Sequence, residues 1–254
     1  MAAREALPSQ LLDQSNRWCL FLDLDGTLIE FAAAPQLVKP PPELVPLLMR
    51  VAEAFDGALA MVSGRSLSEL DQLLAPLRLP AAGLHGVERR DAEGRYSRCP
   101  VDTAAMDEAR RALCALADCH PETVLEDKGL AVALHYRRNP AIGPSIVDEI
   151  HLIAKDLGPT LQMQEGAYVC EIKPSAANKR TAVETFLAEP PFLARRPIFV
   201  GDDLSDRDAF HAVTRRDGLA IAVGARTAAS WRLPNPAAVR RWLAQIAHFA
   251  ASLG

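Results

Sequence analysis

The chain has 254 residues, of which 49% are hydrophobic, and its formal net charge at pH 7 is -4. This length suits one large domain or two small ones, and the hydrophobic fraction is sufficient for folded cores, which excludes a disordered chain. The slight negative charge gives no general attraction to nucleic acid or to membranes, so we expect neither as a partner. No apolar run approaches the roughly 20 residues of a transmembrane helix, and residues 1–17 do not resemble a secretory signal.

The cysteines and histidines indicate neither a disulfide framework nor a zinc site. The cysteine count of five is odd, no C-x-x-C occurs, and the six histidines show no zinc-ligand spacing. We therefore expect buried thiols in a reducing compartment, which predicts a cytoplasmic protein, and we expect it to be a monomer. The cysteines are Cys19, Cys99, Cys114, Cys119 and Cys170.

Strand-like and helix-like apolar patterns alternate along the first hundred residues, as in an α/β fold. In chain order, the predicted elements are a lead-in helix or frayed segment within 1–17, a buried strand over 18–22, a proline-stiffened passage around 35–42, a helix over 43–54, a strand over 58–62, a helix capped by Ser66, a strand over 81–87 and a hairpin turn at 91–94.

The pattern changes between residues 99 and 173 to a helix followed by two strands, repeated once. The first helix begins near Asp102 and the first hairpin turns at Lys128-Gly129. The second helix carries Ile146 and Ile150, and the second hairpin turns at Glu165-Gly166. Such a block is typical of an α+β unit with an antiparallel sheet. We predict a separate cap domain over 99–173, inserted into a core formed by 1–98 and 174–254.

The α/β pattern resumes at Lys179, and the fold class is predicted as α/β with a parallel, Rossmann-like core sheet and an inserted α+β cap. The remaining elements are a helix over 179–187, a strand over 198–200, a strand over 219–223 and a final amphipathic helix that includes Val239, Leu243 and Ile246.

The first strand ends in the string Asp23-Leu24-Asp25-Gly26-Thr27-Leu28. Open α/β sheets bind ligands at the carboxyl ends of their strands. Two aspartates one residue apart repel each other unless a cation or a proton relieves the repulsion. A strand ending in a polar turn is the plain alternative, but the complete string D-x-D-G-T-L is much more specific than a turn.

Three later segments supply further polar groups. Ser63 follows the second strand, Lys179 opens a helix, and Gly201-Asp202-Asp203-Leu204-Ser205-Asp206 follows a strand. Taken singly, these read as a helix-capping serine, a surface lysine and an acidic turn. In this order, and together with D-x-D-G-T-L, they resemble the four motifs of the haloacid dehalogenase (HAD) superfamily of phosphotransferases.

The resemblance implies a role for each motif residue. Asp23 would be the nucleophile that forms an aspartyl-phosphate, and Asp25 would protonate the leaving oxygen and then activate water. A Mg²⁺ ion would be held by the carboxylates of Asp23 and Asp202 and by the backbone carbonyl of Asp25. The residues expected to bind phosphate are Ser63, Gly64, Arg65 and Lys179. The residues expected to support the metal site and Lys179 are Asp203 and Asp206.

Nearly the whole chain is similar to the trehalose-6-phosphate phosphatases, a HAD family with a type IIB cap. The stretches that carry the similarity include Ala82 to Glu88, Leu134-His135-Tyr136-Arg137 and Glu171-Ile172-Lys173-Pro174. This resemblance implies hydrolysis of trehalose 6-phosphate, with charged groups hydrogen-bonded to the sugar hydroxyls. The residues expected to contact the sugar are His85, Glu88, Glu126, Lys128, Arg137, Glu171 and Lys173.

Two positions depart from the family pattern. Arg180 stands where a glycine usually follows the motif lysine, and Arg207 stands where the last motif usually has an acid. These changes bear on rate and substrate fit more than on reaction class. Two alternatives remain: a phosphatase or phosphomutase acting on another sugar phosphate, and a non-catalytic phosphosugar-binding regulator. The presence of both Asp23 and Asp25 disfavours the regulator.

Overall fold

The computed structural model describes residues 18–32 and 37–253. Its chain divides into two compact units, which we call the core unit (Met1–Ser97 and Lys179–Gly254) and the cap unit (Arg98–Asn178). The predicted lead-in helix within 1–17 lies outside the described residues.

The core unit is built on one sheet of eight strands in the order β12-β11-β10-β1-β2-β3-β4-β5. The strands from β12 to β3 pair in parallel with their neighbours, whereas β4 runs antiparallel to β3. The strands are β1 (Trp18–Leu22), β2 (Leu59–Val62), β3 (Ala81–Gly83), β4 (Glu88–Arg90), β5 (Tyr96–Arg98), β10 (Arg196–Gly201), β11 (Leu219–Val223) and β12 (Trp231–Leu233). The parallel, Rossmann-like core predicted from the sequence is confirmed.

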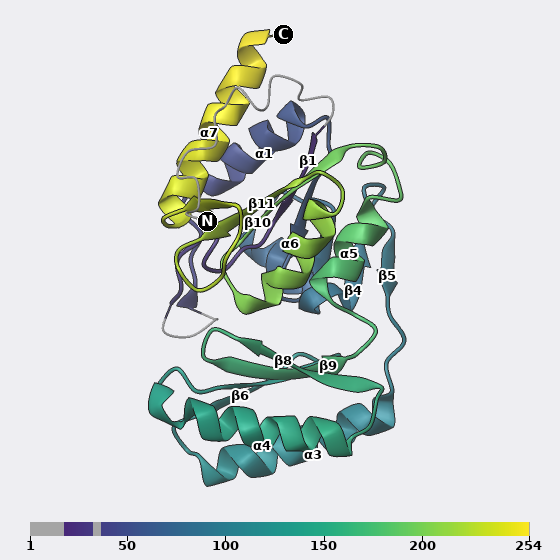
Figure 1. The fold of residues 1–254 in the computed structure, drawn as a ribbon, viewed down its shortest axis with the longest axis vertical. Coiled ribbons are helices and arrows are strands. Elements are labelled where there is room, and N and C mark those ends of the chain that lie inside the picture. Colours follow the sequence, from purple (N-terminus) through teal and green to yellow (C-terminus); the bar gives the residue numbers. More distant parts are fainter. Residues whose placement is uncertain (1–17, 33–36, 254) are drawn as a thin grey trace. The chain divides into compact units, whose positions relative to one another are not determined.

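Helices cover both faces of this sheet. The connection from β1 through α1 leads to β2, while the connection from β10 through α6 leads to β11 in the opposite direction along the sheet. Because such crossovers are right-handed, the two helices lie on opposite faces. Figure 1 shows α1 beside α7 on one face and α5 beside α6 on the other. The core helices are α1 (Leu44–Ala54), α2 (Leu67–Leu73), α5 (Lys179–Phe186), α6 (Arg207–Thr214) and α7 (Pro236–Leu253).

The expected strand over 81–87 was too long, because β3 ends at Gly83 and a 3₁₀ turn, η4 (Leu84–Gly86), follows it. Leu84 and His85 have φ angles of 50° and 56°. This left-handed conformation cannot continue a strand. The short edge strand β12 was not predicted, because three residues are too few for a recognisable alternation.

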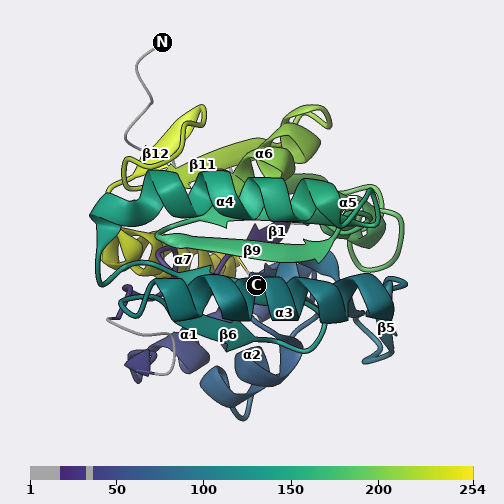
Figure 2. The ribbon, with the colours of Figure 1, turned by 90° about the horizontal axis from the view of Figure 1, so that it is seen from below.

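The cap unit packs two helices against one face of a four-stranded antiparallel sheet in the order β6-β7-β9-β8 (Figure 2). Its buried cluster includes Met106, Leu113 and Ile150, and the predicted start of the first helix is confirmed because Asp102 caps it. The second hairpin turns at Ala167-Tyr168, not at Glu165-Gly166, because Glu165 and Gly166 still pair with β9. The elements are α3 (Thr103–Cys119), β6 (Val124–Asp127), β7 (Val132–His135), η5 (Pro140–Ile142), α4 (Gly143–Asp156), β8 (Leu161–Gly166) and β9 (Val169–Pro174).

The cysteines are all free thiols, but the prediction that they are buried holds only in part. Cys19 and Cys170 are buried and Cys99 is half-buried, whereas Cys114 and Cys119 are exposed on α3. The amphipathic pattern of that helix places both positions away from its apolar face. Over residues 18–32 and 37–253, no helix has the length and apolar character needed to cross a membrane.

We predict that Leu113→Ala destabilises the cap unit, because Leu113 is fully buried in its core. Large-to-small changes of this kind cost about 2–5 kcal/mol. The matched control is Leu152→Ala on α4, where the leucine is 60% exposed, and it should change stability by less than about 0.5 kcal/mol. Urea unfolding with amide hydrogen exchange over residues 98–178 measures both. Equal effects of the two substitutions would contradict this account of the cap core.

Candidate active site

Polar residues follow four adjacent strands of the core sheet. Asp202 follows β10, Asp23 follows β1, Ser63 follows β2, and His85 lies two residues beyond β3. These strands are neighbours and parallel, so their carboxyl ends meet at one edge of the sheet. The structure therefore brings together the motif residues that are separated by up to about 180 positions in the sequence.

The loop after β1 is shaped by Gly26. Its φ of +75° is left-handed, and its amide donates to the carbonyl of Ile29 at 2.8 Å. A side-chain carbon at this position would collide with the carboxylate of Asp202 and with the ring of Phe31. A glycine is thus required here both for the backbone conformation and for the close approach of Asp202.

Three buried carboxylates, those of Asp23, Asp202 and Asp206, have oxygens within 4.8 Å of one another. Lys179, at the start of α5, places its Nζ 2.6 Å from Asp206 Oδ1 and 3.2 Å from Asp23 Oδ1. Burial raises the pKa of Asp23 well above its ordinary value, and Lys179 opposes that rise. Burial by itself would lower the pKa of Lys179, but the carboxylates of Asp206 and Asp23 raise it above its ordinary value.

Both oxygens of Asp206 are used within the protein. Oδ1 accepts from Lys179, and Oδ2 accepts from the backbone N–H of Asp203 at 2.9 Å. A side-chain carbon on Gly201 would collide with the Asp206 carboxylate, so Gly201 allows this close approach. These contacts fit the predicted role of Asp206 as a support for Lys179. Burial raises the pKa of Asp203, whose side chain caps the turn η6 (Leu204–Asp206).

Asp202 contacts a residue that the sequence analysis did not identify. Thr27 Oγ1 donates to Asp202 Oδ1 at 3.2 Å, and Arg226 forms an ion pair with Oδ2. The Arg226 guanidinium also lies 4.4 Å from the ring centroid of Phe31. Burial raises the pKa of Asp202 to about 7, although Arg226 opposes the rise. Arg226 lies in the loop after β11, where a single arginine gives no sequence signal of this contact.

The acidic cluster fits a divalent metal ion. Its donors are all carboxylate oxygens, which are the ligands that Mg²⁺ prefers. The cluster of Asp23, Asp202 and Asp206 includes both carboxylates that the sequence predicts as metal ligands, those of Asp23 and Asp202.

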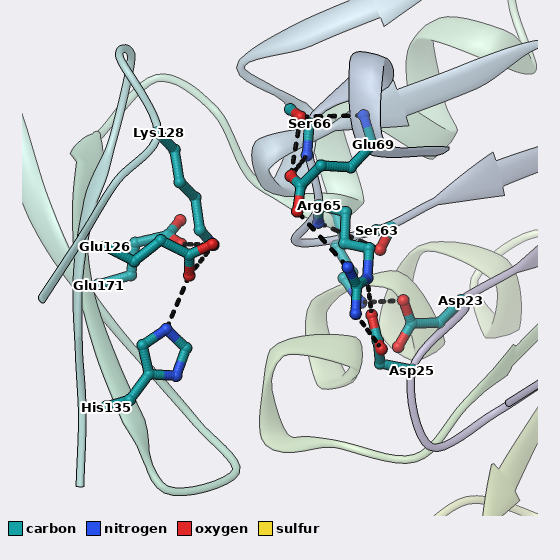
Figure 3. Close-up of polar contacts among 11 residues, drawn as sticks. Asp23, Asp25, Ser63, Arg65, Ser66, Glu69, Glu126, Lys128, His135 and Glu171 are labelled. Carbon is teal, nitrogen blue, oxygen red and sulfur yellow. Dashed lines mark hydrogen bonds and ion pairs between the residues drawn. The ribbon is translucent and has the colours of Figure 1, made fainter. Parts of the chain in front are cut away.

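The other motif aspartate, Asp25, faces an arginine. Arg65 Nε is 2.6 Å from Asp25 Oδ2, and Arg65 Nη2 is 2.8 Å from Oδ1 (Figure 3). The backbone N–H of Arg65 donates to the buried hydroxyl of Ser63 at 3.2 Å. A side-chain carbon on Gly64 would lie 2.7 Å from Nε2 of His85, so the loop after β2 and the turn after β3 are in close contact.

Glu88, a predicted sugar contact, is engaged within the core unit. Its Oε1 accepts from the backbone N–H of Leu67 at 2.5 Å, at the start of α2, and its Oε2 accepts from Tyr96 at 2.7 Å. This explains the burial of a charged side chain on β4. A direct contact between Glu88 and a sugar stays a prediction.

Several predicted sugar contacts gather on the cap sheet. Side chains of Leu125, Leu134 and Cys170 belong to or pack on the buried cluster, so by strand alternation Glu126, His135 and Glu171 lie on the other face. On that face, Lys128 Nζ is 2.6 Å from Glu171 Oε2 and 4.0 Å from Glu126 Oε2, and His135 Nε2 is 2.7 Å from Glu126 Oε2 (Figure 3).

The remaining two predicted cap residues contact backbone carbonyls. Arg137 donates to Ala167 O at 3.2 Å and lies 5.7 Å from the ring centroid of Tyr168, while Lys173 Nζ donates to Ala177 O. His135 was not among the predicted site residues, although it belongs to the Leu134 to Arg137 stretch. Its alternation with buried Leu134 is the signal that places it beside Glu126.

Solved structures identify the fold. A phosphatase of the haloalkanoate (HAD) enzyme superfamily from Bacteroides thetaiotaomicron matches with a TM-score of 0.61 at 14% identity, covering 92% of this chain and 96% of its own. The C-terminal domain of a Candida albicans trehalose-6-phosphate phosphatase matches with a TM-score of 0.84 at 20% identity, covering 96% of this chain and 99% of its own. The chain therefore shares the fold of these two structures, as predicted.

Comparison with known sequences shows which family the chain belongs to. The family model described as trehalose-phosphatase matches residues 21–237. A trehalose-6-phosphate phosphatase from Escherichia coli is 40% identical over 91% of this chain and 87% of its own length. A protein from Sinorhizobium fredii named probable trehalose-phosphate phosphatase is 40% identical over 97% of this chain and 94% of its own length. The chain belongs to the trehalose-phosphatase family.

We predict that Gly26→Ala reduces phosphatase activity at least about a hundredfold, because the new methyl group displaces Asp202, a carboxylate predicted to bind the metal ion at the reacting centre. The matched control is Gly94→Ala. Gly94 has a similar φ of +82°, but a side-chain carbon there has nothing within 4 Å. Both changes incur a left-handed strain of about 1–2 kcal/mol. Hydrolysis of p-nitrophenyl phosphate and thermal unfolding should separate them, and similar activities in the two variants would refute the steric argument.

Proposed function

We propose that this chain hydrolyses trehalose 6-phosphate to trehalose and inorganic phosphate, as a Mg²⁺-dependent step of trehalose biosynthesis. The observation that carries the proposal is the buried group of Asp23, Asp206 and Lys179 beside Asp202, in a chain of the trehalose-phosphatase family. The cytoplasmic location and the monomeric state stay predictions.

Asp23 is the proposed nucleophile. Its carboxylate attacks phosphorus in line with the leaving oxygen and becomes an aspartyl-phosphate, which water then hydrolyses. Mg²⁺ bound by the carboxylates of Asp23 and Asp202 would offset the repulsion between the nucleophile and an anionic phosphate. Lys179 adds a fixed positive charge 3.2 Å from Asp23 Oδ1, so it can hold a phosphoryl oxygen while Asp206 keeps it in place.

Asp25 is the proposed acid and base. It gives a proton to the sugar oxygen that leaves and takes one from the water that attacks the aspartyl-phosphate. The hydroxyl of Ser63 and the backbone at Gly64 are the proposed donors to the equatorial phosphoryl oxygens, where charge is spread during transfer. Ser63 is buried at a strand end next to that of Asp23, which suits this role.

The cap unit is proposed to bind and recognise the sugar. Its charged groups include an ion-paired set of Glu126 and Glu171, from the sheet, and Lys128, from the turn after β6. Lys173 follows on the same strand as Glu171. A disaccharide has many hydroxyls, and charged donors and acceptors make stronger hydrogen bonds to them than neutral groups do. His85 in the core unit remains a proposed sugar contact.

A phosphate-release panel tests the proposed function. We expect trehalose 6-phosphate to be hydrolysed with a kcat/KM at least about tenfold above those of glucose 6-phosphate and sucrose 6-phosphate, a margin of about 1.4 kcal/mol. A clear preference for another sugar phosphate would assign the chain to that substrate. Binding of trehalose 6-phosphate with no phosphate release would favour the regulator alternative.

Metal removal tests the acidic cluster. EDTA should stop the reaction and Mg²⁺ should restore it, because the carboxylates of Asp23 and Asp202 otherwise repel the phosphate. Ca²⁺ should inhibit, since its larger and looser coordination misplaces the nucleophile. Isothermal calorimetry should also show one divalent ion per chain. Full activity in metal-free buffer would rule out the metal site.

Glu171→Ala tests the cap. We expect a loss of about 1.5–3 kcal/mol in kcat/KM for trehalose 6-phosphate, or roughly ten- to a hundredfold, because a charged partner of sugar hydroxyls is removed. Hydrolysis of p-nitrophenyl phosphate, which has no sugar, should change little. Glu149→Ala on the exposed surface of α4 is the control, and it should change the hydrolysis of neither substrate. Equal losses on both substrates with Glu171→Ala would place this residue in the catalytic machinery or in the fold.

A further inference from the structure

We propose that Arg65 is a positioning residue for Asp25, holding its carboxylate in the orientation that proton transfer requires. The proposal rests on the proposed phosphatase function and replaces the phosphate-binding role that the sequence predicted for Arg65. It concerns residues of the core unit alone.

The contact between the two side chains is bidentate. Arg65 Nε and Nη2 lie 2.6 and 2.8 Å from Oδ2 and Oδ1 of Asp25, so one edge of the guanidinium faces both carboxylate oxygens (Figure 3). Two parallel hydrogen bonds fix the plane of a carboxylate, whereas one bond leaves it free to rotate. The side chain of Arg65 is 10% exposed and that of Asp25 is 23% exposed, so the carboxylate is held from the buried side and remains accessible.

Arg65 is itself held in place. Its Nη1 lies 3.5 Å from Oε1 of Glu69, and Oε2 of Glu69 accepts from the backbone N–H and the hydroxyl of Ser66 at 2.9 and 2.8 Å. The Glu69 N–H donates back to Ser66 Oγ at 3.2 Å, and together with the bond from the Ser66 N–H this forms the capping box at the start of α2. The backbone of Arg65 is fixed on both sides, because its N–H donates to Ser63 Oγ and its carbonyl accepts from Leu84 N–H. A rigid helix start thus supports the guanidinium.

This arrangement suits a group that exchanges protons. Each carboxylate oxygen has two lone pairs, and the bidentate contact uses one on each oxygen. The second lone pair of an Asp25 oxygen can therefore carry the proton that goes to the sugar oxygen, and later accept one from water. All three guanidinium nitrogens of Arg65 contact the carboxylates of Asp25 or Glu69. A phosphate ligand would therefore have to displace one of these two carboxylates.

A comparison of two leaving groups distinguishes a positioning role of Arg65 from a phosphate-binding role. A sugar oxygen must be protonated as it leaves, whereas p-nitrophenolate leaves readily without a proton. General acid catalysis typically contributes about 10²–10⁴ in rate. Arg65→Lys keeps the positive charge but removes the planar fork. We expect Arg65→Lys to lower the single-turnover rate of phosphoryl transfer from trehalose 6-phosphate roughly a hundredfold, with little change in KM. The same step with p-nitrophenyl phosphate should fall less than about threefold.

A second variant keeps the test valid if Arg65→Lys folds poorly. Glu69→Gln retains an amide oxygen for the cap at Ser66 but weakens the hold on Arg65, so it should give the same substrate split at roughly a tenth of the size. Arg78→Lys is the matched control, because Arg78 pairs with Asp71 on the exposed side of α2. This control should leave the rates of phosphoryl transfer from both substrates unchanged.

Two outcomes would overturn the proposal. Equal losses on both substrates, with a raised KM and weaker inhibition by inorganic phosphate, would make Arg65 a phosphate ligand. Full activity of Arg65→Lys on both substrates would show that the fork is not needed. A split in Arg65→Lys without any in Glu69→Gln would support the positioning role of Arg65 and remove only the supporting role of Glu69. If the wild-type chain hydrolyses neither substrate, the proposed function itself has failed, which is distinct from both overturning outcomes.

Discussion

Lys179 lies buried with its ammonium group between the carboxylates of Asp206 and Asp23, and the arrangement of the active-site edge depends on this contact. The three residues come from the start of α5, the turn after β10 and the end of β1, so one charge group joins three separate segments. Loss of one partner from a buried ion pair typically costs about 3–5 kcal/mol, because the other charge stays buried without compensation. The same contact that stabilises this edge also places a cation beside the proposed nucleophile.

The balance of charge extends to the neighbouring strand ends. Burial raises the pKa values of Asp23 and Asp202, and Lys179 and Arg226 oppose these rises. A buried acidic cluster of this kind is a natural site for a divalent cation, since added positive charge relieves the repulsion. Asp25 is compensated separately by Arg65. The two motif aspartates therefore differ in their surroundings, as expected of a nucleophile and a proton-transfer group.

Much of the fold and of the candidate active site could be predicted from the sequence. Strand β1, the capped start of α3 and the acidic residues after β10 all have strong local patterns, and parallel strands bring such residues to one edge. Features set by long-range contacts could not be predicted. Arg226 lies in a loop without a pattern, and the pairing of Arg65 with Asp25 joins two strand ends. The turn at Leu84–Gly86 was also missed, since it is bound to the loop after β2: the Leu84 N–H donates to Arg65 O and the His85 N–H donates to Ser63 O.

The proposed mechanism requires that Asp23 accepts the phosphoryl group. Acid quench of the enzyme within one turnover of trehalose 6-phosphate, followed by mass spectrometry of its peptides, tests this most directly. The account predicts one phosphoryl group on Asp23 in the wild-type chain and none in Asp23→Asn, which should also lose turnover. Phosphorylation of a different residue, or inversion of configuration at phosphorus in the overall reaction, would contradict the account.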